Sequence, residues 1–207
     1  MVKILGKASS INVRKVLWTC EELGIGYERE EWGSGFQSTD TPAFKALNPN
    51  AMVPVLVDGD FVLWESNTIC RYLIARQARE DLLPSQPQPR ALVEQWMDWQ
   101  ATELNNAWRY AFMSLVRHSA AHADPVALAA GIQGWHDKMQ ILNDQLARTG
   151  AFITGPDFTV ADIVLGLSVN RWNMTPMARP DLPAISAYHQ RLALRDGFRK
   201  FGCNGTP

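Results

Sequence analysis

Two serines and an asparagine, Ser9, Ser10 and Asn12, stand where an early strand gives way to a helical pattern. The first turn of a helix has unpaired backbone N–H groups, and the helix dipole favours a negative charge there. A hydroxyl that donates to a charged group contributes about 1.5–3 kcal/mol, enough to lower the pKa of a bound thiol by about one to two units. Either serine could therefore stabilise a thiolate or simply cap the helix, and the Asn12 amide could contact a ligand or close a turn.

A second pair of functional groups, Glu65 and Ser66, stands at the start of another helical pattern. Ser66 is a residue type that caps helices. The pair also matches a free α-amino acid, because the helix start attracts the ligand's carboxylate and Glu65 can pair with its ammonium group. The two roles are compatible.

Residues 48–58 contain a proline at the start of an expected strand. Asp58-Gly59 lies between two apolar runs, which is typical of a β-hairpin. Pro54 has no N–H, so it belongs at a strand start, an edge or a bulge. A trans Val53–Pro54 bond is the usual geometry and would leave an ordinary edge strand. A cis bond would turn the N–H and C=O of Val53 toward an extended ligand backbone.

The elements that must position these groups differ between the two halves of the chain. The first half alternates short apolar runs with helical ones, which predicts strands near 3–5 and 27–31, a hairpin after residue 54, and helices over 13–23, 42–47 and 65–76. This order is typical of a mixed sheet with helices on its faces. Residues 84–89, rich in Pro and Gln, break the pattern as a linker would.

Long helices without strands are expected in the second half, over about 91–118 and 125–147. We therefore predict an α/β domain at 1–78, a linker at 79–89 and an all-α domain at 90–207. Thr159 and Asp162 form a capping box flanked by Phe158 and Ile163 as a hydrophobic staple, which predicts the start of a buried helix. Asp162 is accordingly interpreted as a structural residue, not as a catalytic acid.

Composition excludes several classes of function. The chain has 207 residues and a net charge of −1, with no basic run, so nucleic acid is not an expected partner. No apolar run has membrane-spanning length and the N-terminus lacks a signal-peptide core, so we expect no membrane association and a cytoplasmic location. Its three cysteines indicate no disulfide framework. His118 and His122 lie one turn apart but have no third ligand nearby, so no metal is expected.

Aromatic residues in the second half offer an apolar pocket. Trp108, Tyr110 and Phe112 could face the cleft between the two halves, although core packing would give the same helical spacing. Arg109 could hold an anionic co-substrate or extend along the surface. Trp96 and Trp99 are interpreted as core or subunit packing.

Taken together, these motifs resemble those of the cytosolic glutathione transferases, over essentially the full length of the chain. The resemblance is carried by Ser10, Asn12, Lys15-Val16, Glu21-Glu22-Leu23-Gly24, Tyr27-Glu28, Leu47-Asn48-Pro49, Val53-Pro54-Val55-Leu56, Trp64-Glu65-Ser66, Ile69, Arg71-Tyr72-Leu73 and Thr159-Val160-Ala161-Asp162. It implies a thioredoxin-like N-terminal domain and an all-helical C-terminal domain, paired as a homodimer with the ligand cleft between the domains.

The same resemblance assigns roles to the residues of the first half. It implies a cis Pro54, with Val53 pairing with the cysteinyl backbone of glutathione and with Glu65 and Ser66 holding its γ-glutamyl end. Ser10 would face the thiol, as in serine-type members, and Ser9 remains a competitor. Asn12 matches an asparagine of some bacterial members, several of which reduce disulfides.

The expected function is transfer of glutathione to a small apolar electrophile, a detoxification reaction that uses glutathione as co-substrate and no metal. Glutathione-dependent disulfide or peroxide reduction is the alternative enzyme, and a non-catalytic glutathione-binding or ligand-binding protein is the third reading. No cysteine stands where the ligated-thiol classes of the family have one.

Overall fold

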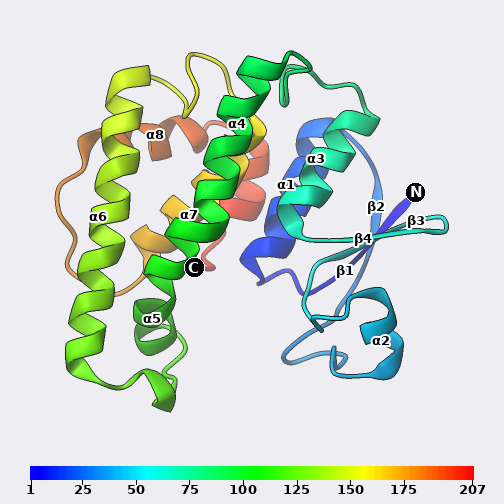
Figure 1. Cartoon of the computed structure of the whole chain (residues 1–207), viewed down its shortest axis with the longest axis horizontal. Helices are drawn as coiled ribbons and strands as arrows, with labels where there is room; N and C mark the ends of the chain where they lie inside the picture. Colours follow the sequence, from blue (N-terminus) through cyan, green and yellow to red (C-terminus); the bar gives the residue numbers. More distant parts are fainter.

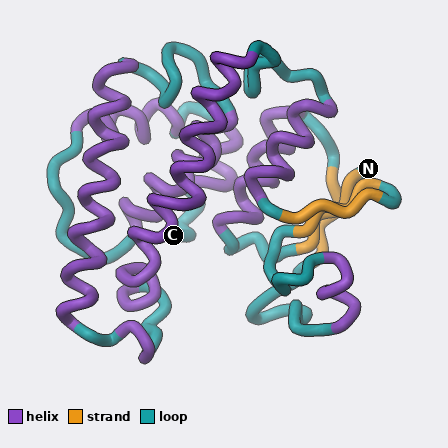
Figure 2. Tube along the Cα trace, in the orientation of Figure 1, coloured by secondary structure: helices purple, strands orange, loops and turns teal.

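A four-stranded mixed sheet forms the centre of the N-terminal half in the computed structural model, which describes residues 1–207. Its strands are β1 (Val2–Leu5), β2 (Tyr27–Glu30), β3 (Val55–Asp58) and β4 (Phe61–Trp64), in the spatial order β2-β1-β3-β4. Strand β1 runs parallel to β2 and antiparallel to β3, and β3 and β4 form the expected hairpin. Figure 2 shows that all strands belong to this half.

Three helices cover the sheet. Helices α1 (Ile11–Leu23) and α3 (Ser66–Arg76) lie together on one face, and α2 (Pro42–Leu47) lies on the other (Figure 1). Helix α1 ends at Gly24, whose left-handed backbone lets its N–H bond back to the last turn, as the sequence predicted. The fold class expected from the sequence is confirmed for this half.

Helices alone build the C-terminal half. They are α4 (Pro87–Trp99), α5 (Asn105–Leu115), α6 (Pro125–Thr149), α7 (Val160–Met174) and α8 (Pro183–Leu192), with a 3₁₀ turn at Ala120–His122 and π-helical segments at Gln100–Leu104 and Phe198–Gly202. Helix α4 begins inside the expected linker segment, because proline is well tolerated in the first turn of a helix. The single helix expected over 91–118 is interrupted by the π-helical segment, so that expectation is corrected.

Helix α7 is the buried centre of the helical half. The capping box expected at its start is present, with Thr159 N and Oγ1 donating to Asp162 Oδ2 at 2.8 and 3.1 Å. Asp162 is fully buried and also accepts from Ile153 N and the Tyr188 hydroxyl. The structural interpretation of Asp162 therefore agrees with its surroundings.

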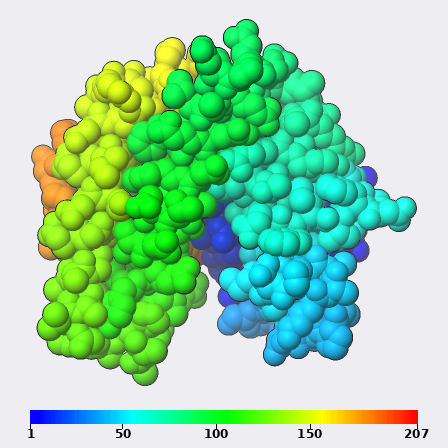
Figure 3. Space-filling model, in the orientation of Figure 1, coloured from blue at the N-terminus to red at the C-terminus, as the bar shows by residue number.

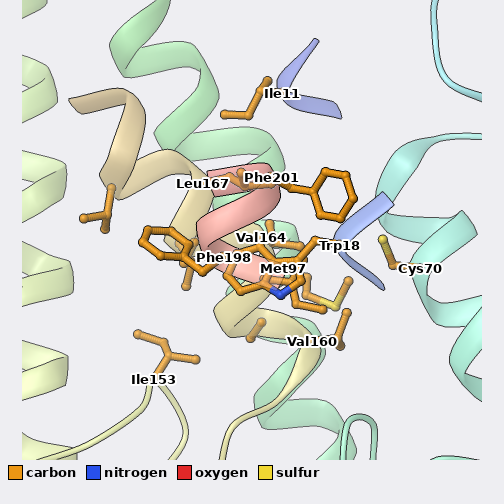
Figure 4. Packing of buried hydrophobic residues seen from close by; sticks show 14 of the residues in the cluster. Ile11, Trp18, Cys70, Met97, Ile153, Val160, Val164, Leu167, Phe198 and Phe201 are labelled. Atoms are coloured by element: carbon orange, nitrogen blue, oxygen red, sulfur yellow. The ribbon is translucent and has the colours of Figure 1, made fainter. Parts of the chain in front are cut away.

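One apolar core runs through both halves of the chain. It contains 39 buried residues, and Trp18 of α1 lies at its centre, with ring centroids 6.0 Å from Phe158 and 5.3 Å from Phe198 (Figure 4). The two halves are therefore packed together rather than merely tethered. None of the helices combines the length and the apolarity that crossing a membrane requires.

The cysteines divide by burial. Cys20 and Cys70 are buried, and burial raises the pKa of these thiols to about 12 and about 11 respectively. Thiols with such pKa values are poor nucleophiles. Cys203 is exposed near the end of the described chain.

Candidate functional site

Ser10 stands at the N-cap position of α1, at the junction of the β1–α1 loop and the helix. Its C=O accepts from Arg14 N at 2.9 Å, but its hydroxyl forms no capping hydrogen bond. The hydroxyl is partly exposed and remains free to donate to a ligand, so the simple capping role is not realised. Ser9 is exposed in the same loop, and Asn12 is partly exposed in the first turn.

Val53 and Pro54 approach this loop from the other side. The Val53–Pro54 bond is cis, as the resemblance implied. A Cβ placed on Gly6 would lie 3.1 Å from Val53 Cβ, so Val53 packs directly against the end of β1. The N–H and C=O of Val53 form no hydrogen bond within the chain. These two groups are therefore available to pair with an extended backbone.

The loop before Val53 is held by Asn48. Its Nδ2 donates to Met52 O at 2.8 Å, and its Oδ1 accepts from Asn50 N at 3.0 Å. Asn48 is buried, so these bonds are shielded from water. The sequence shows Asn48 only as part of a motif, because its role depends on the loop that it closes.

Glu65 has an unusual backbone at the start of α3. Its φ is 74° and its ψ 108°, a strained conformation for a residue with a side chain. Such strain is typical of ligand-binding positions, where the fold around it fixes the geometry. The Glu65 side chain is exposed and forms no ion pair, whereas Ser66 is buried in the first turn behind it.

Asn12, Glu65 and Ser66 meet at a cavity of about 220 Å³ between α1, α3 and the α4–α5 segment. Lys15, Asn67, Arg71 and Asn105 also line it. Figure 3 shows the surface hollowed between the two halves, with the blue N-terminal residues at the bottom of the hollow. Ser10 and Val53 do not line this cavity; Ser10 is the N-cap of α1, the helix that contributes Asn12 to it.

One residue that lines the cavity, Lys15 of α1, is buried. Lys15 Nζ donates to Gln100 Oε1 at 2.8 Å and to Asn67 Oδ1 at 3.2 Å. Burial, with a smaller contribution from Arg171, lowers its pKa to about 8, although Cys70 and Glu65 act to raise it. The ammonium group thus keeps a positive charge near the start of α3 at neutral pH.

Gln100 joins this lysine to the helical half. Its Nε2 donates to Asn105 Oδ1 at 2.8 Å and to Ser168 Oγ at 3.1 Å. It stands at the start of the π-helical segment, a geometry that often accompanies functional sites. The sequence alone indicates no role for Lys15 or Gln100, because Lys15 meets Asn67 of α3 and Gln100 of the π-helical segment only in the folded chain.

The expected aromatic pocket residues lie in different surroundings. Trp108 is partly buried, and its Nε1 donates to Asn105 Oδ1 at 2.9 Å, which puts it beside the cavity. Phe112 is buried in the core. Tyr110 lies toward the start of α6, where its hydroxyl accepts from Asp124 N and its ring packs on His122. Of the three, only Trp108 is joined to the site by a hydrogen bond.

The histidines and Arg109 lie at or near the surface, whereas Trp96 and Trp99 are half-buried and pack against the core. His122 contacts the Ser119 hydroxyl at 2.9 Å, and His118 is exposed. Arg109 is exposed and forms no ion pair. Trp96 and Trp99 pack edge to face, with centroids 5.1 Å apart.

Two family models match the chain. The model described as glutathione S-transferase, N-terminal domain matches residues 9–76, and the model of the C-terminal domain matches residues 125–191. The first match includes all the N-terminal site residues discussed above.

Individual proteins are similar over more than half of the chain or over nearly all of it. Glutathione S-transferase GstB of Escherichia coli (strain K12) is 35% identical over 97% of both chains. Human glutathione S-transferase theta-1 is 36% identical over 59% of this chain and 52% of its own. A solved theta class glutathione S-transferase from Xanthomonas axonopodis pv. citri, with glutathione bound, is 38% identical, has a TM-score of 0.92 and covers 100% of this chain and 99% of its own.

Proposed function

The chain belongs to the glutathione S-transferase family, and we propose that it joins the thiolate of glutathione to a small apolar electrophile. The observation that carries this proposal is the uncommitted Ser10 hydroxyl at the start of α1, next to a cavity lined by Asn12, Glu65 and Ser66. The similar Xanthomonas enzyme with glutathione bound supports glutathione as the co-substrate here.

Glutathione would be held by its backbone and by its γ-glutamyl end. The unpaired N–H and C=O of Val53 suit the cysteinyl backbone, next to Pro54. The free amides at the start of α3 and Ser66 suit the γ-glutamyl carboxylate, and Glu65 suits the ammonium group. The positive charge of Lys15 behind this helix start adds to the attraction for the carboxylate.

The chemical step needs glutathione with its thiol ionised and an electrophilic carbon held close to the sulfur. The Ser10 hydroxyl, the Asn12 amide and the first-turn N–H groups of α1 stabilise the thiolate, and the thiol proton passes to solvent. The sulfur then attacks the electrophilic carbon, a C–S bond forms, and the leaving group departs with its electron pair. Holding both reactants in the cleft makes the attack effectively intramolecular.

Glutathione-dependent disulfide reduction is the second candidate, and the presence of Asn12 at the cavity favours it. In that reaction the bound thiolate attacks a disulfide sulfur and one thiolate leaves. Neither buried cysteine could assist, since the pKa values of both are raised by burial.

One pair of assays separates these functions. Purified protein is tested with glutathione against 1-chloro-2,4-dinitrobenzene and against a small dialkyl disulfide. Conjugation of the aryl chloride is the expected result. Activity with the disulfide alone would replace conjugation by reduction, and retained glutathione binding without either activity would indicate a binding protein.

The proposal includes the oligomeric state and the domain bounds. We propose that the protein is a homodimer. Sedimentation equilibrium measures the mass of the particle in solution and would test this. We also propose the domain bounds expected from the sequence, 1–78 and 90–207, with the segment 79–89 between them.

A further inference from the structure

Arg171 of α7 is a buried cation packed against two aromatic rings, Trp108 and Phe112, which are themselves in edge-to-face contact. Its guanidinium carbon lies 4.4 Å from the centroid of Trp108 and 4.1 Å from that of Phe112. Only 3% of the residue is exposed. Contact with aromatic rings holds a guanidinium in place but satisfies none of the five N–H donors in the guanidinium plane.

No protein group accepts a hydrogen bond from this guanidinium. The Nε atom is buried without a partner. The two Nη atoms also have no acceptor and form no ion pair. They are not among the fully buried unpaired atoms, so they are the part of the side chain that keeps contact with solvent. A buried arginine normally has a carboxylate partner, since removing an unpaired charge from water is costly.

The charged groups around Arg171 are cations. Burial and, to a smaller extent, the charges of Arg14 of α1 and Arg117 after α5 lower the pKa of Arg171 to about 9, so it stays charged at neutral pH. Helix α5 contains no acidic residue, and the one acid of α7, Asp162, is bonded at the opposite end of that helix. The guanidinium of Arg14 is bonded to the backbone oxygens of Phe201, Thr206 and Pro207, whereas that of Arg171 has no such acceptor.

Arg171 lies next to the proposed glutathione site. Its aromatic neighbour Trp108 bonds to Asn105, and Asn105 lines the cavity that holds Asn12, Glu65 and Ser66. The positive charge of Arg171 is also close enough to influence the pKa of Lys15, which lines that cavity. An electrophile placed beside Trp108 would therefore meet both the thiolate and the guanidinium.

We propose that Arg171 binds the anionic group of the electrophile, so that the preferred substrate has a small aromatic body and a carboxylate. This proposal rests on the proposed function and adds the substrate class. The ring of the substrate packs beside Trp108, and its carboxylate accepts from the free Nη groups of Arg171, an interaction that desolvation strengthens. Displacement of an aryl chloride then proceeds as above: the C–S bond forms, chloride leaves, and the thiol proton goes to solvent.

Binding can be tested without turnover. Glutathione-saturated protein is titrated with 3,5-dinitrobenzoate and with the neutral 3,5-dinitrobenzamide, two rings of nearly the same shape. We expect the carboxylate to bind about 10- to 100-fold more tightly, as a charge-assisted hydrogen bond implies. Equal affinity of the two compounds would overturn the proposal, whatever the activity of the enzyme.

Turnover gives the second test. We compare 4-chloro-3,5-dinitrobenzoate with its carboxamide, each corrected for its uncatalysed reaction with glutathione. In Arg171→Met, kcat/KM for the carboxylate should fall about 10- to 100-fold while that for the carboxamide stays near the wild-type value. Equal losses for both substrates would assign Arg171 a structural role and overturn the anion site.

The control variant is Arg109→Met, which removes one positive charge from an exposed position of α5. It should leave the preference for the carboxylate unchanged, because an exposed charge is screened. Loss of the preference in this variant would mean that general charge attraction, not Arg171, selects the anion. Turnover of the carboxamide by wild-type protein tests the proposed function separately from the anion site.

Discussion

At the scale of single residues, the free hydroxyl of Ser10 favours a catalytic role over a capping role. Because Ser10 makes no side-chain cap, Ser10→Ala should cost little stability, yet it should raise the pKa of bound glutathione thiol by about one to two units. Near neutral pH, kcat/KM for the aryl chloride should fall about 10-fold or more. The ultraviolet absorbance of the bound thiolate, followed against pH, measures the shift.

Ser9→Ala is the matched control for this prediction. Ser9 is exposed in the same loop and carries the same group, so its removal should leave the pKa of the bound thiol unchanged. If the pKa shift appeared in the Ser9 variant instead, the thiolate would face Ser9 and our assignment would be wrong.

The buried Lys15 predicts a pH-dependent stability. Its pKa is about 8 in the folded chain and about 10.5 when unfolded, so the folded state binds fewer protons between these values. The free energy of unfolding therefore gains from this group as the pH rises from about 8 to about 10.5, and below pH 8 the buried charge is unfavourable. Lys15→Met should remove this rise, on the order of a few kcal/mol, in urea titrations at several pH values.

Lys138→Met provides the comparison, since Lys138 pairs with Glu103 near the surface at 2.7 Å. This variant should keep the wild-type pH dependence, because surface pairs contribute little. An unchanged pH profile in Lys15→Met would contradict the charge assigned to the buried lysine.

The sequence predicts some of the candidate site residues and not others, for a physical reason. Ser10 and Glu65 are N-cap residues and Ser66 is the first residue of α3, and a helix start is visible in the local sequence. The roles of Lys15 and Arg171 arise from burial against distant elements, and no local pattern contains that information. The burial of Phe112 is not predictable from the local sequence either, because its helical spacing fits a pocket as well as a core.

At the scale of elements, the start of α7 depends on one carboxylate. Asp162→Ala would leave Ile153 N and Thr159 N buried without an acceptor, and the Tyr188 hydroxyl would keep only the backbone carbonyl of residue 162, at 3.3 Å. Each such loss costs about 1–3 kcal/mol, so we expect the variant to lose several kcal/mol or to fail to fold. Chemical denaturation measures the loss.

Asp124→Ala is the control, because Asp124 caps α6 from an exposed position through one bond to Ala127 N at 2.8 Å. It should cost only about 1 kcal/mol. Similar losses in the two variants would mean that Asp162 contributes no more than an ordinary cap.

The elements themselves were largely predictable from the sequence. Proline, glycine and capping residues set the limits of α2, the hairpin turn and the starts of α6 and α7, and these signals are local. The π-helical segment at Gln100–Leu104 was not predictable, because the extra residue changes the hydrophobic period too little to be noticed. It nevertheless positions Gln100, which joins the two halves at the site.

At the scale of the whole molecule, the two halves share one core, and the cleft depends on how they pack. Trp18 of α1 is fully buried against Phe158 and Phe198 of the helical half. Arg195 adds an ion pair to Glu22 of α1 at 2.6 Å. A shared core of this kind favours one cooperative unfolding transition, so probes placed in the two halves should report the same midpoint.

Gly197 is the point of closest approach in this shared core, and it gives the sharpest test of it. A Cβ at Gly197 would overlap the indole of Trp18, which is packed too tightly to move aside, so Gly197→Ala should destabilise the chain by about 1–3 kcal/mol. Gly134→Ala, in α6 with open space around the added carbon, should instead stabilise it by about 0.5–1 kcal/mol, since alanine favours helix. Thermal melting of both variants measures the difference. If Gly197→Ala were as stable as Gly134→Ala, α1 would not be fixed against the helical half, and the geometry that joins Ser10 to Trp108 and Arg171 would lose its support.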